Sequence, residues 1–227
     1  MNYLHQFVFG IYPYIALAIF LVCSLMRFDR EQYTWKSESS QVFYGGLLRF
    51  GSPLFHVGIL GLFFGHAAGL LTPVWVWDTL GVTHGVKQTV AMVAGGVMGL
   101  LCLAGLLMLL VRRFGNERVA ARSTFKDKLV LLWILLTLLL GLSSIFVSAS
   151  HMDGHMMVLL MTWAQHVVTF RGDAAGFVAD APWIFKLHLF MGMSLFVIFP
   201  FTRLVHVWSG FGAVAYLGRA WQLVRRR

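Results

Sequence analysis

Residues 54–69 read LFHVGILGLFFGHAAG, a stretch that contains two histidines but no acidic residue, lysine or arginine. The apolar run around it extends from Pro53 to Trp77. Because a helix rises about 1.5 Å per residue, about 20 such residues cross the hydrocarbon core of a membrane. This run therefore predicts a transmembrane helix, and its two histidines are candidates for function.

Four further runs have the same apolar character. They cover Phe7–Met26, Thr89–Val111, Leu129–Ser148 and Trp183–Trp208. Of the 227 residues, 59% are hydrophobic and 12% are charged, whereas soluble domains are about 45–50% apolar and about 25% charged. We therefore expect an all-α fold, an integral membrane bundle of five transmembrane helices that forms a single domain over residues 1–227.

Lysine and arginine are concentrated in alternate segments between these runs. Three segments hold most of them, namely the one between the first and second runs, the one between the third and fourth runs, and the C-terminal tail: Arg27, Arg30, Lys36 and Arg49; Arg112, Arg113, Arg118, Arg122, Lys126 and Lys128; and Arg203, Arg219, Arg225, Arg226 and Arg227. Because cytoplasmic loops are enriched in positive charge, the N-terminus is predicted to face outward and the C-terminus to lie in the cytoplasm. Charge that is sorted by membrane side argues against nucleic-acid binding.

Two segments outside the runs carry expectations of their own. The external segment between the fourth and fifth runs predicts a short interfacial helix over Met156–Phe170. The tail Tyr216–Arg227 mixes aromatic and basic residues, which suits either a cytoplasmic membrane surface or a partner protein. All nine acidic residues lie outside the five runs, which argues against a carboxylate proton relay across the membrane.

Four of the nine histidines lie within the predicted spans. Because the second and fifth spans run in opposite directions, His66 and His188 both lie nearer the outside, and His56 and His206 both lie nearer the cytoplasm. One neutral imidazole from each of two facing helices can supply both axial ligands of a haem iron. The two pairs therefore predict two haems stacked across the bilayer, and the other interpretation is that each histidine is hydrogen-bonded to a neighbouring helix.

The spacing of the histidines tests this hypothesis. His188 and His206 are 18 residues apart, which is five helical turns, so both project from one face of a helix. His56 and His66 are 10 residues apart, which leaves them about 80° out of alignment and about 15 Å apart, against about 27 Å on the fifth span. A bend at Pro200 or tilted helices would absorb the mismatch, so the spacing leaves the geometry open.

Small and basic residues near the histidines are further candidates. Glycines allow close approach of a helix or of a flat macrocycle, and they are Gly58, Gly61, Gly65, Gly69, Gly95, Gly96, Gly99 and Gly192. Haem propionates need cations near the membrane faces, and the candidates are Arg49, Arg112 and Arg203 on the inner side with Lys87 and Lys186 on the outer side. The alternative for each cation is a side chain that extends from the membrane toward water.

Several motifs, in this order and spacing, resemble one known family. They are IYPYIA at Ile11–Ala16, QYTW at Gln32–Trp35, LFHVGILG around His56, GHAAG at His66, VKQTVAM with Lys87, HMDG at His151, WAQHVVTF at Trp163–Phe170 and FPFTRLVHVWS ending at Ser209. Together they cover nearly the whole chain. The sequence resembles the gamma, or cytochrome b, subunit of membrane-bound respiratory nitrate reductase.

The resemblance implies a specific assignment of sites and partners. His66 and His188 would ligate an outer haem b, and His56 and His206 an inner haem b. Quinol would be oxidised near the outer haem, where Lys87 and Gly65 match positions implicated in that site. An iron-sulfur beta subunit and a molybdenum-containing alpha subunit, which reduces nitrate, would bind on the cytoplasmic face of the bacterial inner membrane.

Two alternatives remain open from the sequence. One is a cytochrome b subunit of another respiratory complex, such as formate dehydrogenase, hydrogenase or a heterodisulfide-reductase-like complex. The other is a transporter or structural anchor that binds no haem, although an odd number of spans does not divide into two equal repeats. The identity of the cytoplasmic subunit distinguishes the first alternative, and the haem content distinguishes the second.

Overall fold

The computed structural model describes residues 2–30 and 45–208, and every regular element within these ranges is helical. Five helices are long and apolar enough to cross a membrane. They are α2 (Tyr12–Arg30), preceded by α1 (Tyr3–Gln6) and a π-helical turn over Phe7–Ile11, then α3 (Gly46–Leu71), α5 (His84–Gly115), α7 (Phe125–Ala149) and α10 (Trp183–Ile198), which a 3-10 turn extends to Phe201. The predicted all-α bundle of five transmembrane helices is confirmed.

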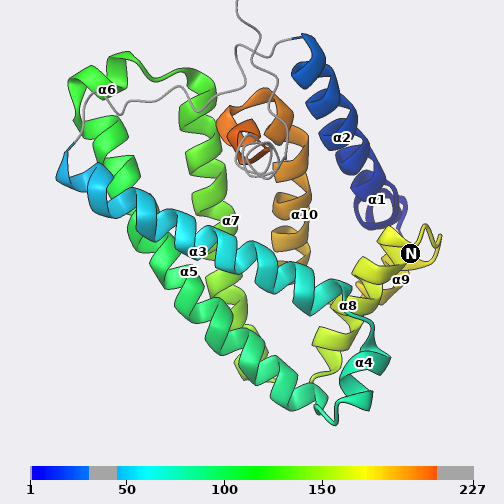
Figure 1. Cartoon of the computed structure of the whole chain (residues 1–227). Coiled ribbons are helices and arrows are strands. Elements are labelled where there is room, and N and C mark those ends of the chain that lie inside the picture. Colours follow the sequence, from blue (N-terminus) through cyan, green and yellow to red (C-terminus); the bar gives the residue numbers. More distant parts are fainter. Residues whose placement is uncertain (1, 31–44, 209–227) are drawn as a thin grey trace, which may run out of the picture.

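Short helices lie at the two ends of this bundle (Figure 1). At one end are α4 (Val74–Thr79), α8 (His155–Val168) and α9 (Ala174–Phe177), and we name this the α8 end. At the other is α6 (Glu117–Ala121), and we name this the α6 end. The helix predicted over Met156–Phe170 corresponds to α8, whereas the tail Tyr216–Arg227 lies outside the described residues.

Glycines allow α3 and α5 to pack closely against each other. A Cβ atom on Gly58 of α3 would overlap the backbone of Cys102, and one on Gly105 of α5 would overlap the backbone of Phe55. Only hydrogen fits at either contact. This contact is the small-residue packing expected of membrane helices, where close backbone approach increases van der Waals attraction.

Two apolar clusters hold the remaining helices together. In the first, α8 and α9 pack on the start of the first membrane helix, and the Trp163 indole donates a hydrogen bond to the Phe9 carbonyl at 2.9 Å. In the second, α5 packs on α7 through fully buried Leu106 and Val130. Many other large apolar side chains are exposed, such as Phe146 at 79%, which suits contact with lipid.

The fifth membrane helix ends before its apolar run does. α10 stops at Ile198 because Pro200 has no N–H to donate to the preceding turn. Two 3-10 turns follow, Phe199–Phe201 and Arg203–Val205, with Thr202 extended between them (φ −122°, ψ −178°). The bend expected at Pro200 is therefore a break, and His206 lies beyond it instead of on one face of a continuous helix.

Candidate functional site

The first histidine pair lies toward the α8 end and joins α3 to α10. The ring centroids of His66 and His188 are 6.1 Å apart, with an angle of 45° between the ring planes. His66 donates through Nδ1 to the carbonyl of Leu62 at 2.7 Å. His188 donates through Nδ1 to the carbonyl of Thr137 at 3.0 Å, so α7 holds the ring that α10 carries.

The second pair lies toward the α6 end. The ring centroids of His56 and His206 are also 6.1 Å apart, with the ring planes at 78°. His56 donates through Nδ1 to the carbonyl of Ser52 at 2.7 Å, and His206 donates through Nδ1 to the carbonyl of Arg203 at 2.6 Å. The four predicted histidines are thus brought together in the predicted pairs.

These hydrogen bonds decide the tautomer of each ring. A carbonyl oxygen can only accept, so each Nδ1 must carry the hydrogen, and in a neutral imidazole Nε2 then keeps its lone pair. Metal-ligating histidines usually have this arrangement, in which a hydrogen bond from one nitrogen orients the ring and the other nitrogen binds the metal. All four histidines have the donor chemistry of metal ligands.

The separation of the rings also suits a shared metal. An imidazole nitrogen lies about 2 Å from a bound metal and about 1 Å from its own ring centre, so two rings on opposite sides of one metal have centroids about 6 Å apart. Both pairs have this separation. Among the described residues, no group of three or more His, Cys, Asp or Glu side chains is placed to hold a metal ion.

Gly141 of α7 was not singled out in the sequence, yet it makes room for His188. A Cβ atom at this position would lie 2.9 Å from Cε1 of the His188 ring. Gly65 and Gly192 differ, because a Cβ atom on either would have nothing within 4 Å. A glycine that faces a histidine on another helix gives no signal in the sequence beyond its small size.

Lys87 lies at the α8 end and is only 7% exposed. Its ammonium group donates to the carbonyl of Gly69 at 2.9 Å and to the sulfur of Met161, and it lies 4.7 Å from the centre of the Trp77 ring. Gly65 lies one helical turn before Gly69 on α3, so it shares the face that Lys87 approaches. No motif or spacing in the sequence pointed to Met161 or Trp77.

The other candidate cations have different surroundings. Arg49 is exposed and its guanidinium lies 5.6 Å from the centre of the Phe50 ring, whereas Arg112 is buried. Arg203 pairs with Asp127, the Nε to Oδ1 distance being 3.5 Å. Lys186 donates to the carbonyl of Ala179 at 2.6 Å. Of these cations, Arg203 has the most direct link to a paired histidine, because its own carbonyl accepts from His206.

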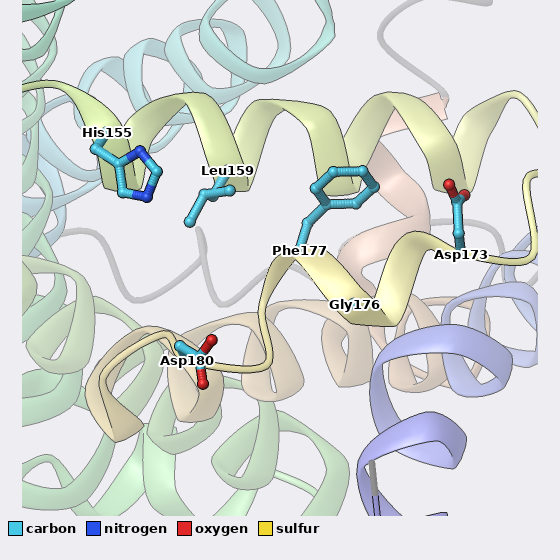
Figure 2. Close-up of a pocket in the computed structure, with 6 residues that line it drawn as sticks. All are labelled: His155, Leu159, Asp173, Gly176, Phe177 and Asp180. Carbon is cyan, nitrogen blue, oxygen red and sulfur yellow. The ribbon is translucent and has the colours of Figure 1, made fainter.

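A pocket of about 440 Å³ opens between α8 and α9 (Figure 2). None of the site residues predicted from the sequence lines it. His155, Asp173 and Asp180 line it together with Leu159, Gly176 and Phe177. Asp173 accepts a hydrogen bond from Nδ1 of His166 at 2.7 Å. That hydrogen bond holds the pKa of Asp173 below its ordinary value.

Comparison with known proteins identifies close similarity along the whole chain. A family model described as nitrate reductase gamma subunit matches residues 5–227. The respiratory nitrate reductase 1 gamma chain of Escherichia coli is 48% identical over 227 residues and is covered completely, as is this chain. The respiratory nitrate reductase 2 gamma chain of the same organism is 45% identical, with 100% of this chain and 99% of the relative covered. The nitrate reductase gamma chain of Bacillus subtilis is 34% identical over 98% of each chain.

Proposed function

The chain belongs to the nitrate reductase gamma subunit family, and from that premise we propose that it is the di-haem subunit that oxidises quinol for nitrate reduction. It is a multi-pass protein of the bacterial inner membrane and part of an oxidoreductase complex. As a gamma subunit it works with catalytic partner subunits. The proposal concerns what this chain contributes to that complex.

The observation that carries the proposal is the geometry of the two histidine pairs. Each pair has a centroid separation of 6.1 Å, and each ring presents Nε2 because Nδ1 donates to a carbonyl. His66 with His188, and His56 with His206, would each hold one haem b. Bound in this way, haem b supplies a one-electron redox centre at each of two depths in the membrane.

The chain's own residues orient the rings. The carbonyl hydrogen bonds fix each ring plane and favour the neutral tautomer that ligates a metal. Gly141 leaves the space that the His188 ring occupies. The cations proposed to lie near the anionic propionates are Arg49, Arg112 and Arg203 toward the α6 end, and Lys87 and Lys186 toward the α8 end.

Lys87 is the residue proposed to bind quinol, with Gly65 one helical turn before the Gly69 carbonyl that Lys87 contacts. An ammonium group has three N–H donors, and two of those on Lys87 are directed at Gly69 and Met161. The third can donate to a quinol oxygen. Gly65 adds no bulk on the same face of α3, which leaves room for a flat ring next to His66.

The distribution of charge supports a direction for the reaction. The basic α6 end would face the cytoplasm, where an iron-sulfur subunit and a molybdenum subunit would receive the electrons and reduce nitrate. Quinol oxidised at the α8 end would release its protons outside. Each charge moved across the membrane in this way corresponds to about 2.3 kcal/mol per 100 mV of membrane potential.

Haem analysis of the purified complex tests the proposal. Extraction as the pyridine haemochrome should give two haems b per gamma chain. His66→Ala and His188→Ala should each remove the same haem, while His56→Ala and His206→Ala should each remove the other. His155→Ala, which changes a histidine outside both pairs, should retain both haems. Loss of different haems in the two members of one pair, or no haem in the folded wild-type protein, would contradict the proposal.

A further inference from the structure

Asp127 is a buried carboxylate at the α6 end, 7% exposed, in the first turn of α7. The sequence placed all acidic residues outside the spans, but α7 begins at Phe125 and includes this one. Thr124 and Asp127 form a reciprocal capping box at the start of the helix. Capping alone does not require a buried charge, because a neutral oxygen also accepts these hydrogen bonds.

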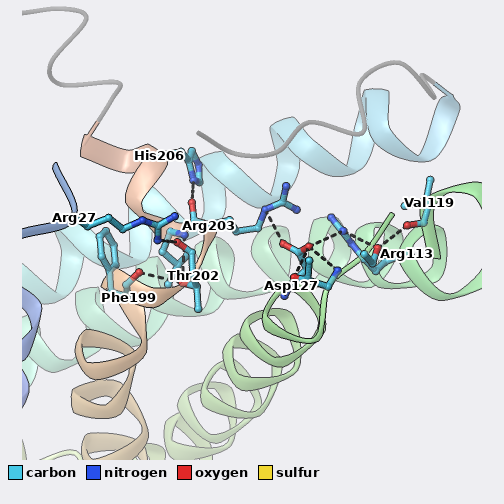
Figure 3. Close-up of polar contacts among 11 residues, drawn as sticks. Arg27, Arg113, Val119, Asp127, Phe199, Thr202, Arg203 and His206 are labelled. Atoms are coloured by element: carbon cyan, nitrogen blue, oxygen red, sulfur yellow. Dashed lines mark hydrogen bonds and ion pairs between the residues drawn. The ribbon is translucent and has the colours of Figure 1, made fainter. Parts of the chain in front are cut away.

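The two carboxylate oxygens of Asp127 have different partners (Figure 3). Oδ2 accepts from the backbone N and the hydroxyl of Thr124, both at 3.0 Å, and lies 3.8 Å from Nη1 of Arg113 on α5. Oδ1 lies 3.5 Å from Nε of Arg203. One oxygen therefore completes the cap, and the other faces the segment that follows α10.

That segment has little regular structure of its own to hold it. α10 ends at Ile198, Thr202 is extended, and Arg203 begins a 3-10 turn of three residues. Side chains from other helices anchor it instead. Arg27 of α2 donates to the carbonyls of Pro200 at 2.7 Å and Thr202 at 3.0 Å, and Asp127 of α7 binds the Arg203 side chain (Figure 3).

The Arg203 turn in turn orients a paired histidine. The carbonyl of Arg203 accepts from Nδ1 of His206 at 2.6 Å. Arg113 and Arg203 both lie within 4 Å of the Asp127 carboxylate, so loss of its negative charge would leave two guanidinium groups repelling each other. The repulsion would act on the residue whose carbonyl holds the His206 ring.

We propose that Asp127 is a positioning residue for His206, which it holds through Arg203 in the orientation needed to ligate the haem toward the α6 end. The inference rests on the proposed function, since it assigns a support to one of the two haem sites. The other pair has an independent support, because Thr137 and Leu62 supply its carbonyl acceptors. The effect of Asp127 is therefore confined to one haem.

Electron paramagnetic resonance of oxidised membranes that contain the assembled complex tests this inference. The low-field line of a low-spin haem with two histidine ligands reports the relative orientation of the imidazole planes. Asp127→Asn keeps a capping oxygen but removes the charge, so we expect the line of the His56/His206 haem to shift and the line of the His66/His188 haem to stay. Asp127→Glu retains the charge, so its His56/His206 line should lie closer to the wild-type position than that of Asp127→Asn.

Glu117→Gln is the matched control, because it removes the same charge from an exposed carboxylate on α6 at the same end of the molecule. It should leave both lines unchanged. If Asp127→Asn does not accumulate, Arg203→Gln provides a second variant, since it breaks the pairing with Asp127 but keeps the backbone carbonyl. It should shift the same line.

Two results would overturn the inference. One is that the Asp127→Asn and Arg203→Gln variants have a lower thermal stability but an unchanged His56/His206 line. Asp127 would then act only as a helix cap. The other is an equal change in both haems. Failure of the proposed function would look different, because the wild-type complex itself would then lack the two low-spin lines.

Discussion

At the scale of single residues, a backbone carbonyl accepts a hydrogen bond from Nδ1 of each of the four paired histidines, and the Ser52 hydroxyl also lies 3.3 Å from Nδ1 of His56. His56, His66 and His206 each donate to a carbonyl three or four residues earlier, so local structure orients these rings. His188 is the exception, because its acceptor, Thr137, lies on α7. The pair toward the α8 end therefore depends on how α7 and α10 align, and Gly141 is the residue that allows this alignment.

Replacement of Lys87 by methionine should impair the use of quinol. A hydrogen bond from a charged donor contributes about 1.5–3 kcal/mol, and about 1.4 kcal/mol corresponds to a tenfold change in rate. We expect quinol-dependent nitrate reduction by Lys87→Met membranes to fall about tenfold or more, while nitrate reduction by a dye that reduces the partner subunits directly stays unchanged. Lys126→Met, at an exposed position, is the control, and equal loss with both electron donors would contradict the role in quinol binding.

The hydrogen bond between His166 and Asp173 should make stability depend on pH. The pKa of Asp173 lies below its ordinary value of 3.8, chiefly because the hydrogen bond from His166 stabilises the carboxylate. A group with a lowered folded-state pKa stabilises the fold above its unfolded pKa, and the contribution disappears as the pH falls through the folded pKa. Asp173→Asn should therefore lower the melting temperature in detergent at pH 6. The difference from wild type should begin to shrink as the pH falls below 3.8 and should vanish below the lowered folded-state pKa.

Asp180→Asn is the control for this measurement, because it removes an exposed carboxylate from the rim of the same pocket. At pH 6 we expect this variant to lower the melting temperature by less than Asp173→Asn does. A destabilisation by Asp173→Asn that stayed constant down to pH 3 would show that its origin is not the ionised carboxylate.

At the scale of helices, the contact between α3 and α5 fixes where His56 and His66 lie. Gly105→Val would force atoms into the space occupied by the backbone of Phe55, the neighbour of His56. Overpacking costs about 1–3 kcal/mol or more when a backbone has to move. We expect a lower melting temperature and reduced occupancy of the haem bound by His56 and His206. Gly95→Val, at a position of α5 with nothing within 4 Å of a Cβ atom, should change neither, and equal effects of the two variants would contradict this account.

Some features of the helices could be predicted from the sequence, and others could not. The five spans were predictable because lipid requires long apolar helices, and the histidine pairs were predictable because antiparallel helices bring residues of equal depth together. The end of α10 was less clear, since Pro200 indicates a bend or a break equally well. The anchors of the site were not predictable, because the Thr137 carbonyl, Gly141 and the link from Asp127 to Arg203 join segments that lie far apart in the sequence.

The Thr124–Asp127 capping box is a different case, since its pattern is local and visible in the sequence. It would have indicated that α7 starts before Leu129. The pattern does not reveal the second partner of the carboxylate, Arg203, because Arg203 lies in the segment after α10.

At the scale of the whole molecule, the two ends of the bundle differ in charge, and this difference predicts the orientation in the membrane. The α6 end carries Arg112, Arg113, Arg118, Arg122, Lys126 and Lys128 in one connecting region, which should lie in the cytoplasm. The α8 end should then face outward. This orientation decides whether quinol protons are released outside and whether the partner subunits bind on the cytoplasmic side.

Single cysteines at exposed positions test the orientation directly. In a background with Cys23 and Cys102 replaced by serine, Gly172→Cys places a thiol at the α8 end and Glu117→Cys places one at the α6 end. A maleimide that cannot cross membranes should label Gly172→Cys in intact spheroplasts and Glu117→Cys only in inverted vesicles or after detergent. Labelling in the opposite sense would reverse the orientation, and the outward release of protons and the cytoplasmic docking of the partners would then both be wrong, while the assignment of histidines to haems would stand.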